Sequence, residues 1–229
     1  MLTPFGDGIW IAKGPVLCSY GFSFPTRCAV IKLVNGGVVI WSPVELTESI
    51  QEAIDAIGPV VALIAPNSFH HQFFAQWVEA YPDAKCFAAP RLREKRRDIV
   101  FNEVLEDRPD QIWAQDMAQV IVRGNLLTDE VVFFHKPSGT ILFTDLLQQF
   151  DKGWFKGWRA IVARLDFIES EKPQVPRKFR WAFRDRDAAR VSVKTILSWP
   201  AQQVLMAHGR PVTSDARGLL KRAFSWLTV

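Results

Sequence analysis

Cysteine and histidine are scarce in this chain of 229 residues, which contains three cysteines and four histidines. An odd and small number of cysteines argues against a disulfide framework and is typical of a reducing compartment. No run approaches the roughly 18 consecutive apolar residues that a membrane-spanning helix needs. The N-terminus also lacks the basic and apolar regions of a secretory signal. The sequence therefore predicts a cytoplasmic protein without structural disulfides.

Segments that would separate domains are also missing. No repeat and no linker rich in glycine, serine or proline interrupts the chain, and its composition is 48% hydrophobic and 23% charged. That composition is ordinary for a globular protein and argues against disorder. We therefore expect one domain over residues 1–229.

Charge gives little indication of a macromolecular partner. The 28 basic and 24 acidic residues leave a net charge of +4. The sequence contains no phosphate-binding loop and no recognised nucleic-acid motif. We expect neither nucleic acid nor a membrane surface as partner, and instead an unknown small-molecule ligand.

Hydrophobic periodicity divides the chain into strands and helices. A hairpin is expected at Asn35–Gly37, because asparagine and glycine tolerate the positive φ of a tight turn. Val60–Pro66 is a continuous apolar run, typical of a strand that is buried on both faces. The succession of antiparallel strands, mixed strands and helices, and further antiparallel strands predicts two sheets with helices outside. The expected strands are 8–12, 28–34, 38–44, 60–66, 86–90, 118–122, 130–135, 140–145 and 203–207, and the main expected helices are 47–57, 187–199 and 215–227.

All four histidines lie at the end of an expected strand or just beyond it, and one aspartate does the same. These residues are His70, His71, His135, His208 and Asp145. Sites in sheet-based folds gather at strand ends, because the loops there carry side chains on a rigid frame. Imidazoles and carboxylates are typical zinc ligands. The alternative interpretation is that each histidine is a hydrogen-bonded polar residue at the edge of the core.

The order of the elements and several short motifs carry a resemblance to a known family. Ala62–His71 (Ala-Leu-Ile-Ala-Pro-Asn-Ser-Phe-His-His) leads from a strand into a loop with two histidines, Thr140–Leu146 contains an aspartate, and Ala207–Gly209 contains a histidine. Together with Phe5–Trp10 and Cys28–Leu33, these stretches resemble the metallo-β-lactamase superfamily. The resemblance covers nearly the whole chain and implies an α/β (α+β) fold, a four-layer αβ/βα sandwich. The sequence is similar in particular to a divergent branch of this superfamily that is known only as a domain of unknown function.

The first metal site of that family has no counterpart in this sequence. Pro66 and Ser68 stand where the leading histidines of the His-x-His-x-Asp-His motif are expected. The loop Arg123–Leu127, where the third ligand is expected, contains no histidine. Ser42 and the following proline replace an acidic residue that commonly supports the metal ligands in the family. The resemblance therefore implies that only the second metal site is retained.

At the second site the resemblance implies four ligands. His70 stands at the motif aspartate and His71 at its final histidine, while Asp145 and His208 match the two remaining ligands. Three imidazoles and one carboxylate suit a single tetrahedral zinc; iron, manganese or no metal are the alternatives. Four protein ligands would leave no open position, which favours a structural metal over a catalytic one.

Three further residues are candidates for supporting the metal ligands or contacting substrate: Asn67, His135 and Trp154. His135 matches no family ligand. Trp154 belongs to Lys152–Phe167, a segment rich in tryptophan and basic residues. Read as a helix, this segment carries an apolar stripe, which we interpret as covering the core or as a lid beside the site. The alternative is a helix that lies on a membrane surface.

Two kinds of function remain open at this point. The first is a metal-dependent hydrolase of unknown substrate. The second is a protein that kept the fold, lost the chemistry and serves in binding or structure, with the tryptophan-rich segment as a surface-active element. The metal content of the purified protein separates the two.

Overall fold

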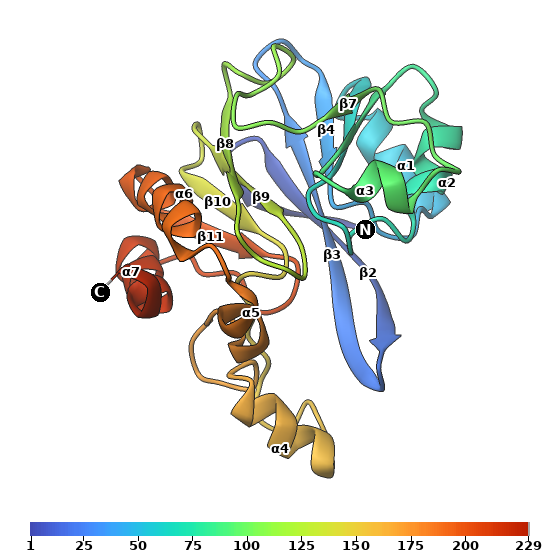
Figure 1. Cartoon of the computed structure of the whole chain (residues 1–229). Helices are drawn as coiled ribbons and strands as arrows, with labels where there is room; N and C mark the ends of the chain where they lie inside the picture. The colour runs from blue at the N-terminus through green and yellow to red at the C-terminus, as the bar shows by residue number, and fades with distance from the viewer. Residues whose placement is uncertain (229) are drawn as a thin grey trace.

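The computed structural model describes residues 1–228, and its strands form two sheets (Figure 1). In the seven-stranded sheet, β1 to β4 pair antiparallel and β4 to β7 pair parallel. The strands of this sheet, in spatial order, are β1 (Leu2–Gly6), β2 (Ile9–Ser19), β3 (Phe22–Lys32), β4 (Val38–Trp41), β5 (Val60–Ala65), β6 (Lys85–Ala88) and β7 (Glu103–Val104).

The second sheet has four strands in the order β11-β10-β9-β8. They are β8 (Met117–Val122), β9 (Glu130–His135), β10 (Thr140–Phe143) and β11 (Gln203–Met206). β8, β9 and β10 pair antiparallel, whereas β10 and β11 run parallel. Parallel strands end at the same edge, so the loops that follow β10 and β11 emerge together.

Helices cover the outer face of each sheet, which gives the expected four-layer αβ/βα sandwich (Figure 1). The strand residues that face the other sheet form one buried cluster between the sheets. The helices over the first sheet are α1 (Glu48–Asp55), α2 (Phe74–Ala80) and α3 (Leu92–Lys95), and those over the second are α6 (Arg186–Ser198) and α7 (Ala216–Thr228).

β5 illustrates how the sequence produces these layers. Ala62 and Ile64 belong to the cluster between the sheets, whereas Leu63 and Ala65 belong to the cluster under the helices. Side chains alternate between the two faces of a strand, so a strand with a hydrophobic layer on each side needs a continuous apolar run. α1 begins where expected, because the Thr47 hydroxyl accepts a hydrogen bond from the Ile50 N–H at 3.4 Å.

Two segments differ from the sequence-based expectation. β2 continues beyond Ala12, and β3 begins well before Cys28, so the two strands form a long hairpin with its tip at residues 20–21. A register shift between Lys13 and Val16 accommodates the glycine and proline that interrupt the strand pattern there. The hairpin extends from the body of the protein beside α4 (Trp158–Leu165), and α5 (Arg177–Ala182) connects α4 to the second half of the fold (Figure 1).

The apolar stripe of the tryptophan-rich segment is mostly exposed. Phe155 is buried, but Trp158, Ile161 and Leu165 are more than half exposed. The interpretation that this stripe covers the core is therefore wrong for these three side chains. The reason is geometric, because α4 packs on the narrow hairpin rather than on a broad sheet. None of the helices within residues 1–228 is both long and apolar enough to cross a membrane.

Candidate metal centre

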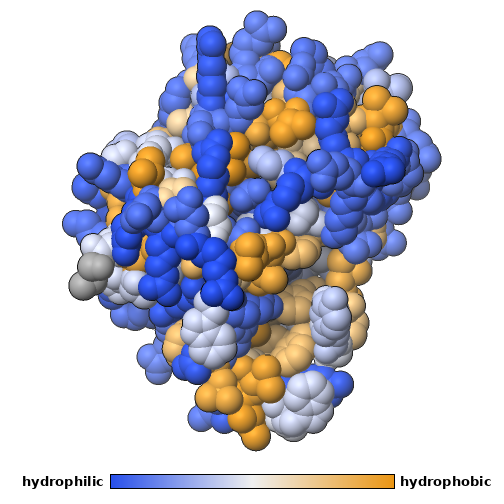
Figure 2. Space-filling model, in the orientation of Figure 1, coloured by the Kyte–Doolittle hydropathy of each residue, from blue (hydrophilic) through white to orange (hydrophobic). Residues whose placement is uncertain are grey.

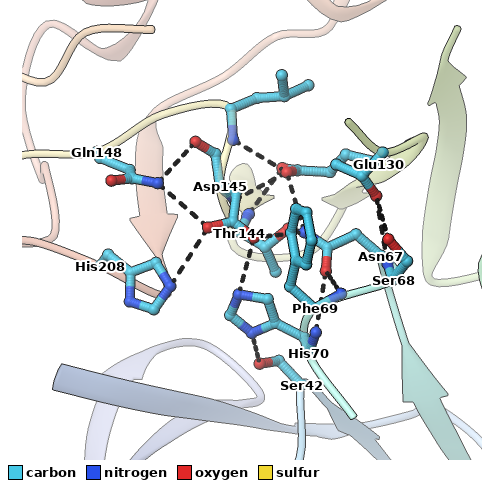
Figure 3. Close-up of polar contacts among 12 residues, drawn as sticks. Ser42, Asn67, Ser68, Phe69, His70, Glu130, Thr144, Asp145, Gln148 and His208 are labelled. Atoms are coloured by element: carbon cyan, nitrogen blue, oxygen red, sulfur yellow. Dashed lines mark hydrogen bonds and ion pairs between the residues drawn. The ribbon is translucent and has the colours of Figure 1, made fainter. Parts of the chain in front are cut away.

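Three side chains with metal-ligating atoms converge where β5, β10 and β11 end. His70 comes from the turn after β5, Asp145 from the loop after β10, and His208 from the loop after β11 (Figure 3). One ligand atom from each residue lies within 4.8 Å of the other two. The strands that position them belong to both sheets, so the rigid frame of the sandwich sets the geometry.

The carboxylate of Asp145 lies between the two imidazoles. Its Oδ2 is 3.2 Å from Nε2 of His70, and its Oδ1 is 3.5 Å from Nε2 of His208. The two imidazole rings have their centroids 5.1 Å apart. Bonds of about 2.0–2.1 Å to a tetrahedral zinc ion place neighbouring ligand atoms about 3.3 Å apart. The two distances to the Asp145 carboxylate are close to this spacing.

Two amides hold the Asp145 carboxylate in place. Nδ2 of Asn67 donates to Oδ2 at 2.7 Å, and Nε2 of Gln148 donates to Oδ1 at 3.1 Å (Figure 3). Burial alone would raise the pKa of Asp145. The two imidazoles and the Asn67 amide lower the pKa by more than burial raises it, so it lies below the usual range. A buried carboxylate that stays ionised is suited to holding a cation.

The hydrogen bonds of the two rings decide which nitrogen faces Asp145 with a lone pair. Nδ1 of His208 lies 2.8 Å from the carbonyl oxygen of Pro25, which can only accept, so Nδ1 carries the proton. Burial lowers the pKa of His208 to about 4 despite the charge of Asp145. The neutral ring therefore presents the lone pair of Nε2 to a carboxylate oxygen. Two acceptors that face each other in this way fit a cation between them.

Ser42 holds the second ring in the matching orientation. Its Oγ lies 2.8 Å from Nδ1 of His70 and 3.2 Å from the carbonyl oxygen of Arg27. When the hydroxyl donates to that carbonyl, it accepts from Nδ1 and leaves Nε2 of His70 free as a ligand. Ser42 has a φ of 56°, a left-handed conformation that is costly for a residue other than glycine. The sequence suggested only that an acidic support was missing here; the structure shows a hydroxyl in its place.

We expect Ser42→Ala to weaken zinc binding by about 10–100-fold, because loss of a group that orients a ligating imidazole has effects of this size. Equilibrium titration against a chromophoric zinc chelator measures the change. Ser42→Gly is the matched variant, since it also removes the hydroxyl but relieves the positive φ. Both variants should lose zinc affinity equally, even if the glycine variant is the more stable. Wild-type affinity in either variant would contradict this role of the hydroxyl.

Glu130 fixes the loop that carries Asp145. Its carboxylate is buried and accepts backbone hydrogen bonds from Thr144, Asp145 and Leu146 at 2.7, 2.8 and 3.0 Å. Burial raises the pKa of Glu130, and the nearby charge of Asp145 raises it further. Sequence reasoning did not assign this role. The available signal was a lone carboxylate at the start of strand β9, directly before a run of four apolar residues.

His71, which the resemblance implied as a fourth ligand, lies outside this group. Its Nδ1 is 2.8 Å from Nη1 of Arg96, and the same guanidinium nitrogen donates to the His71 carbonyl oxygen. Oδ1 of Asn67 accepts from the N–H groups of Phe69 and His70, and this turn directs the two neighbouring histidines to different sides. The expectation for His71 is corrected: the structure brings together His70, Asp145 and His208, and the His71 ring lies apart from them.

Of the three other candidate residues, Asn67 contacts the ligand group and His135 and Trp154 do not. Nδ2 of Asn67 donates to the Asp145 carboxylate. His135 lies at the far end of β9 from Glu130, where its Nδ1 pairs with Oγ of Ser138 at 2.8 Å. Nε1 of Trp154 donates to the carbonyl oxygen of Ser23 at 2.9 Å. Within residues 1–228, neither His135 nor Trp154 has a polar contact with the three ligand residues.

The three side chains line a cavity of about 930 Å³ between the β2–β3 hairpin and the helices α4 and α5. Most of its other lining residues are apolar, and they include Leu17, Phe22, Phe24, Phe69, Val162 and Ile168. Lys95, Arg177 and Lys178 contribute basic side chains to the lining, and Asp166 contributes an acidic one. A cavity of this size and character suits a small molecule with a large apolar part.

Comparisons with known proteins agree with this fold. The family described as "Domain of unknown function (DUF4336)" matches residues 17–156, which is more than half of the chain. A metallo-β-lactamase from Pontibacter korlensis superposes with a TM-score of 0.67 at 14% identity, over 100% of this chain and 98% of that chain. One from Hirschia baltica gives 0.65 at 14% identity, over 100% and 97%.

The Flv1 flavodiiron core from Synechocystis is also similar, with a TM-score of 0.64 at 11% identity, over 100% of this chain and 60% of that chain. Identities this low establish the fold alone, and the expected metallo-β-lactamase fold is confirmed. No curated protein matches the sequence.

Proposed function

This chain belongs to the family of the domain of unknown function DUF4336, and we propose that it is a hydrolase that depends on a single metal ion. His70, Asp145 and His208 would hold the ion. The lone pair of His208 Nε2, which faces the buried carboxylate of Asp145 at 3.5 Å, is the observation that carries the proposal. Zinc is the metal that we propose, because two imidazoles and one carboxylate are a common zinc set.

The number of ligands supports a catalytic metal rather than a structural one. Structural zinc sites are closed by four protein ligands, whereas catalytic sites have three and keep one position for water or substrate. With His71 turned toward Arg96, three of the four expected residues lie together within residues 1–228, and all three line the cavity. The objection raised by a four-ligand set therefore no longer applies. Iron(II) and manganese remain alternatives, since a set of two histidines and one carboxylate also binds them.

The residues around the three ligands have two roles, orienting the ligands and binding the substrate. A bound zinc supplies a Lewis acid and activates water for attack on a carbonyl or phosphoryl group. Asn67 and Gln148 hold the Asp145 carboxylate, and Ser42 and the Pro25 carbonyl oxygen fix the tautomers of the two rings. The apolar walls of the cavity bind the substrate and exclude bulk water.

We propose that the protein acts as a single domain, that it works in the cytoplasm, and that its substrate is a small molecule. Three free cysteines, one of them exposed, support a reducing compartment. The size and apolar lining of the cavity support a small-molecule substrate over a macromolecule.

The experiment starts from protein stripped of metal with a chelator. After titration with zinc, iron(II) or manganese and removal of excess ion, elemental analysis should find one ion per chain. Hydrolysis of a panel of lactam, thioester and phosphodiester substrates should then depend on the restored ion. Absence of near-stoichiometric metal after reconstitution would overturn the metal site. Stoichiometric metal without turnover on any substrate class would instead favour a binding protein that lost the chemistry.

A further inference from the structure

Exposed apolar side chains gather where the β2–β3 hairpin and α4 extend from the body of the protein. Trp158 and Ile161 are 58% and 60% exposed, and Trp181 of α5 is 70% exposed. Figure 2 shows pale aromatic and orange aliphatic side chains at this lower end of the molecule. We call this surface the hairpin–α4 face, and its apolar residues are Tyr20, Trp154, Trp158, Ile161, Leu165 and Trp181.

The hairpin–α4 face is held in a fixed shape. The ring of Trp158 meets the ring of Phe22 edge-on with centroids 5.8 Å apart, and Phe155 meets the same ring at 5.4 Å. The indole N–H of Trp154 bonds to the hairpin at Ser23, while Ala163 faces a small buried cluster. α4 thus uses its inner side to pack on the hairpin, and its outer side is left to solvent.

Positive charge is interleaved with these side chains. Between Asp151 and Asp166 the sequence holds Lys152, Lys156, Arg159 and Arg164 and no acidic residue. Arg177 and Lys178 follow on α5, where the Asp166 carboxylate offsets part of their charge. Within residues 1–228, Arg164 is the one member of this basic set that forms an ion pair, with Glu169 at 3.0 Å. Lys152 and Arg164 line a second cavity together with acidic residues, so the positive charge of the hairpin–α4 face comes from Lys156, Arg159, Arg177 and Lys178.

Contrary to the expectation from the sequence, we propose that the hairpin–α4 face binds the surface of an anionic lipid membrane. Tryptophan and tyrosine favour the depth of the lipid headgroups, and lysine and arginine are attracted to anionic lipids. A short helix with aliphatic and aromatic residues outside and bases beside them has the composition of an interfacial helix. A second copy of the chain is the less suitable occupant, because a symmetric contact would bring two basic surfaces together.

Binding in this orientation directs the cavity toward the lipid. Three residues of the hairpin–α4 face, Tyr20, Leu165 and Trp181, also line the cavity. An amphiphilic molecule could therefore pass from the membrane into the cavity without crossing water. The membrane contact itself does not depend on a metal, so it stands or falls separately from the proposed hydrolase.

Vesicle co-sedimentation of the full chain tests the proposal. Vesicles of equal parts phosphatidylserine and phosphatidylcholine should bind the wild type, and vesicles of phosphatidylcholine alone should bind it far less. Lys156→Glu should weaken binding by about tenfold or more, since each base near an anionic surface contributes substantially. Ile161→Ser should weaken it several-fold through lost apolar contact. Neither side chain is buried, so both variants should fold.

Two matched variants on α6 serve as controls. Val191→Ser removes an aliphatic side chain that is 69% exposed, and Lys194→Glu reverses an exposed base, both away from the hairpin–α4 face. Both should bind vesicles as the wild type does. Absence of wild-type binding to the anionic vesicles, or equal losses in the α6 variants, would overturn the proposal. A dimer in sedimentation velocity that Ile161→Ser dissociates, without vesicle binding, would assign the face to self-association instead.

Discussion

Asp145→Asn should reduce zinc affinity by more than about a hundredfold, a loss beyond that seen for residues that only support metal ligands. The substitution keeps the size of the side chain and removes the negative charge that lies between His70 and His208. Competition with a chromophoric chelator measures the affinity, and circular dichroism checks that the fold is retained.

His71→Ala is the control for that experiment. The two histidines are neighbours in sequence, but the His71 ring pairs with Arg96 instead of Asp145. The His71 variant should therefore bind zinc almost as the wild type does. A large loss in His71→Ala together with unchanged binding in Asp145→Asn would show that the metal site is wrongly assigned.

Glu130→Leu should lower the free energy of unfolding by about 3–5 kcal/mol, because each buried N–H left without an acceptor costs about 1–3 kcal/mol. The three N–H groups concerned belong to Thr144, Asp145 and Leu146. Urea denaturation at neutral pH measures the difference. Zinc binding should weaken as well, since the loop that carries Asp145 loses its anchor.

Two variants define what the carboxylate contributes. Glu130→Gln can keep an oxygen toward the Asp145 and Leu146 N–H groups and turn its amide nitrogen toward the Thr144 N–H, so about one third of the loss is expected. Glu52→Leu on α1 replaces an exposed glutamate and should change stability by less than about 0.5 kcal/mol. Equal stability of Glu130→Leu and Glu52→Leu would show that the buried hydrogen bonds do not anchor the loop.

Much of the fold could be predicted from the sequence because burial leaves a periodic pattern. β5 reads as a continuous apolar run since it is buried on both faces, and α1 shows both its apolar spacing and its capping Thr47. The same patterns placed His70, Asp145 and His208, and equally His71, just after strands of one sandwich. Because strand ends on a rigid frame are fixed in space, their convergence followed from the topology.

The choice between His70 and His71, in contrast, was decided only by the tertiary structure. The two histidines are adjacent and of the same type, so no sequence pattern distinguishes them. The directions of their side chains depend on the turn that Asn67 closes and on Arg96, which pairs with the His71 ring. Ser42 likewise gains its role only when β4 brings it beside the His70 ring. Sequence patterns report which side chains are buried along one element, because burial repeats with the period of the element. They do not report which side chains from distant elements meet, because that depends on loop conformations and on packing between elements, and for this reason the exposed face of α4 also became visible only in three dimensions.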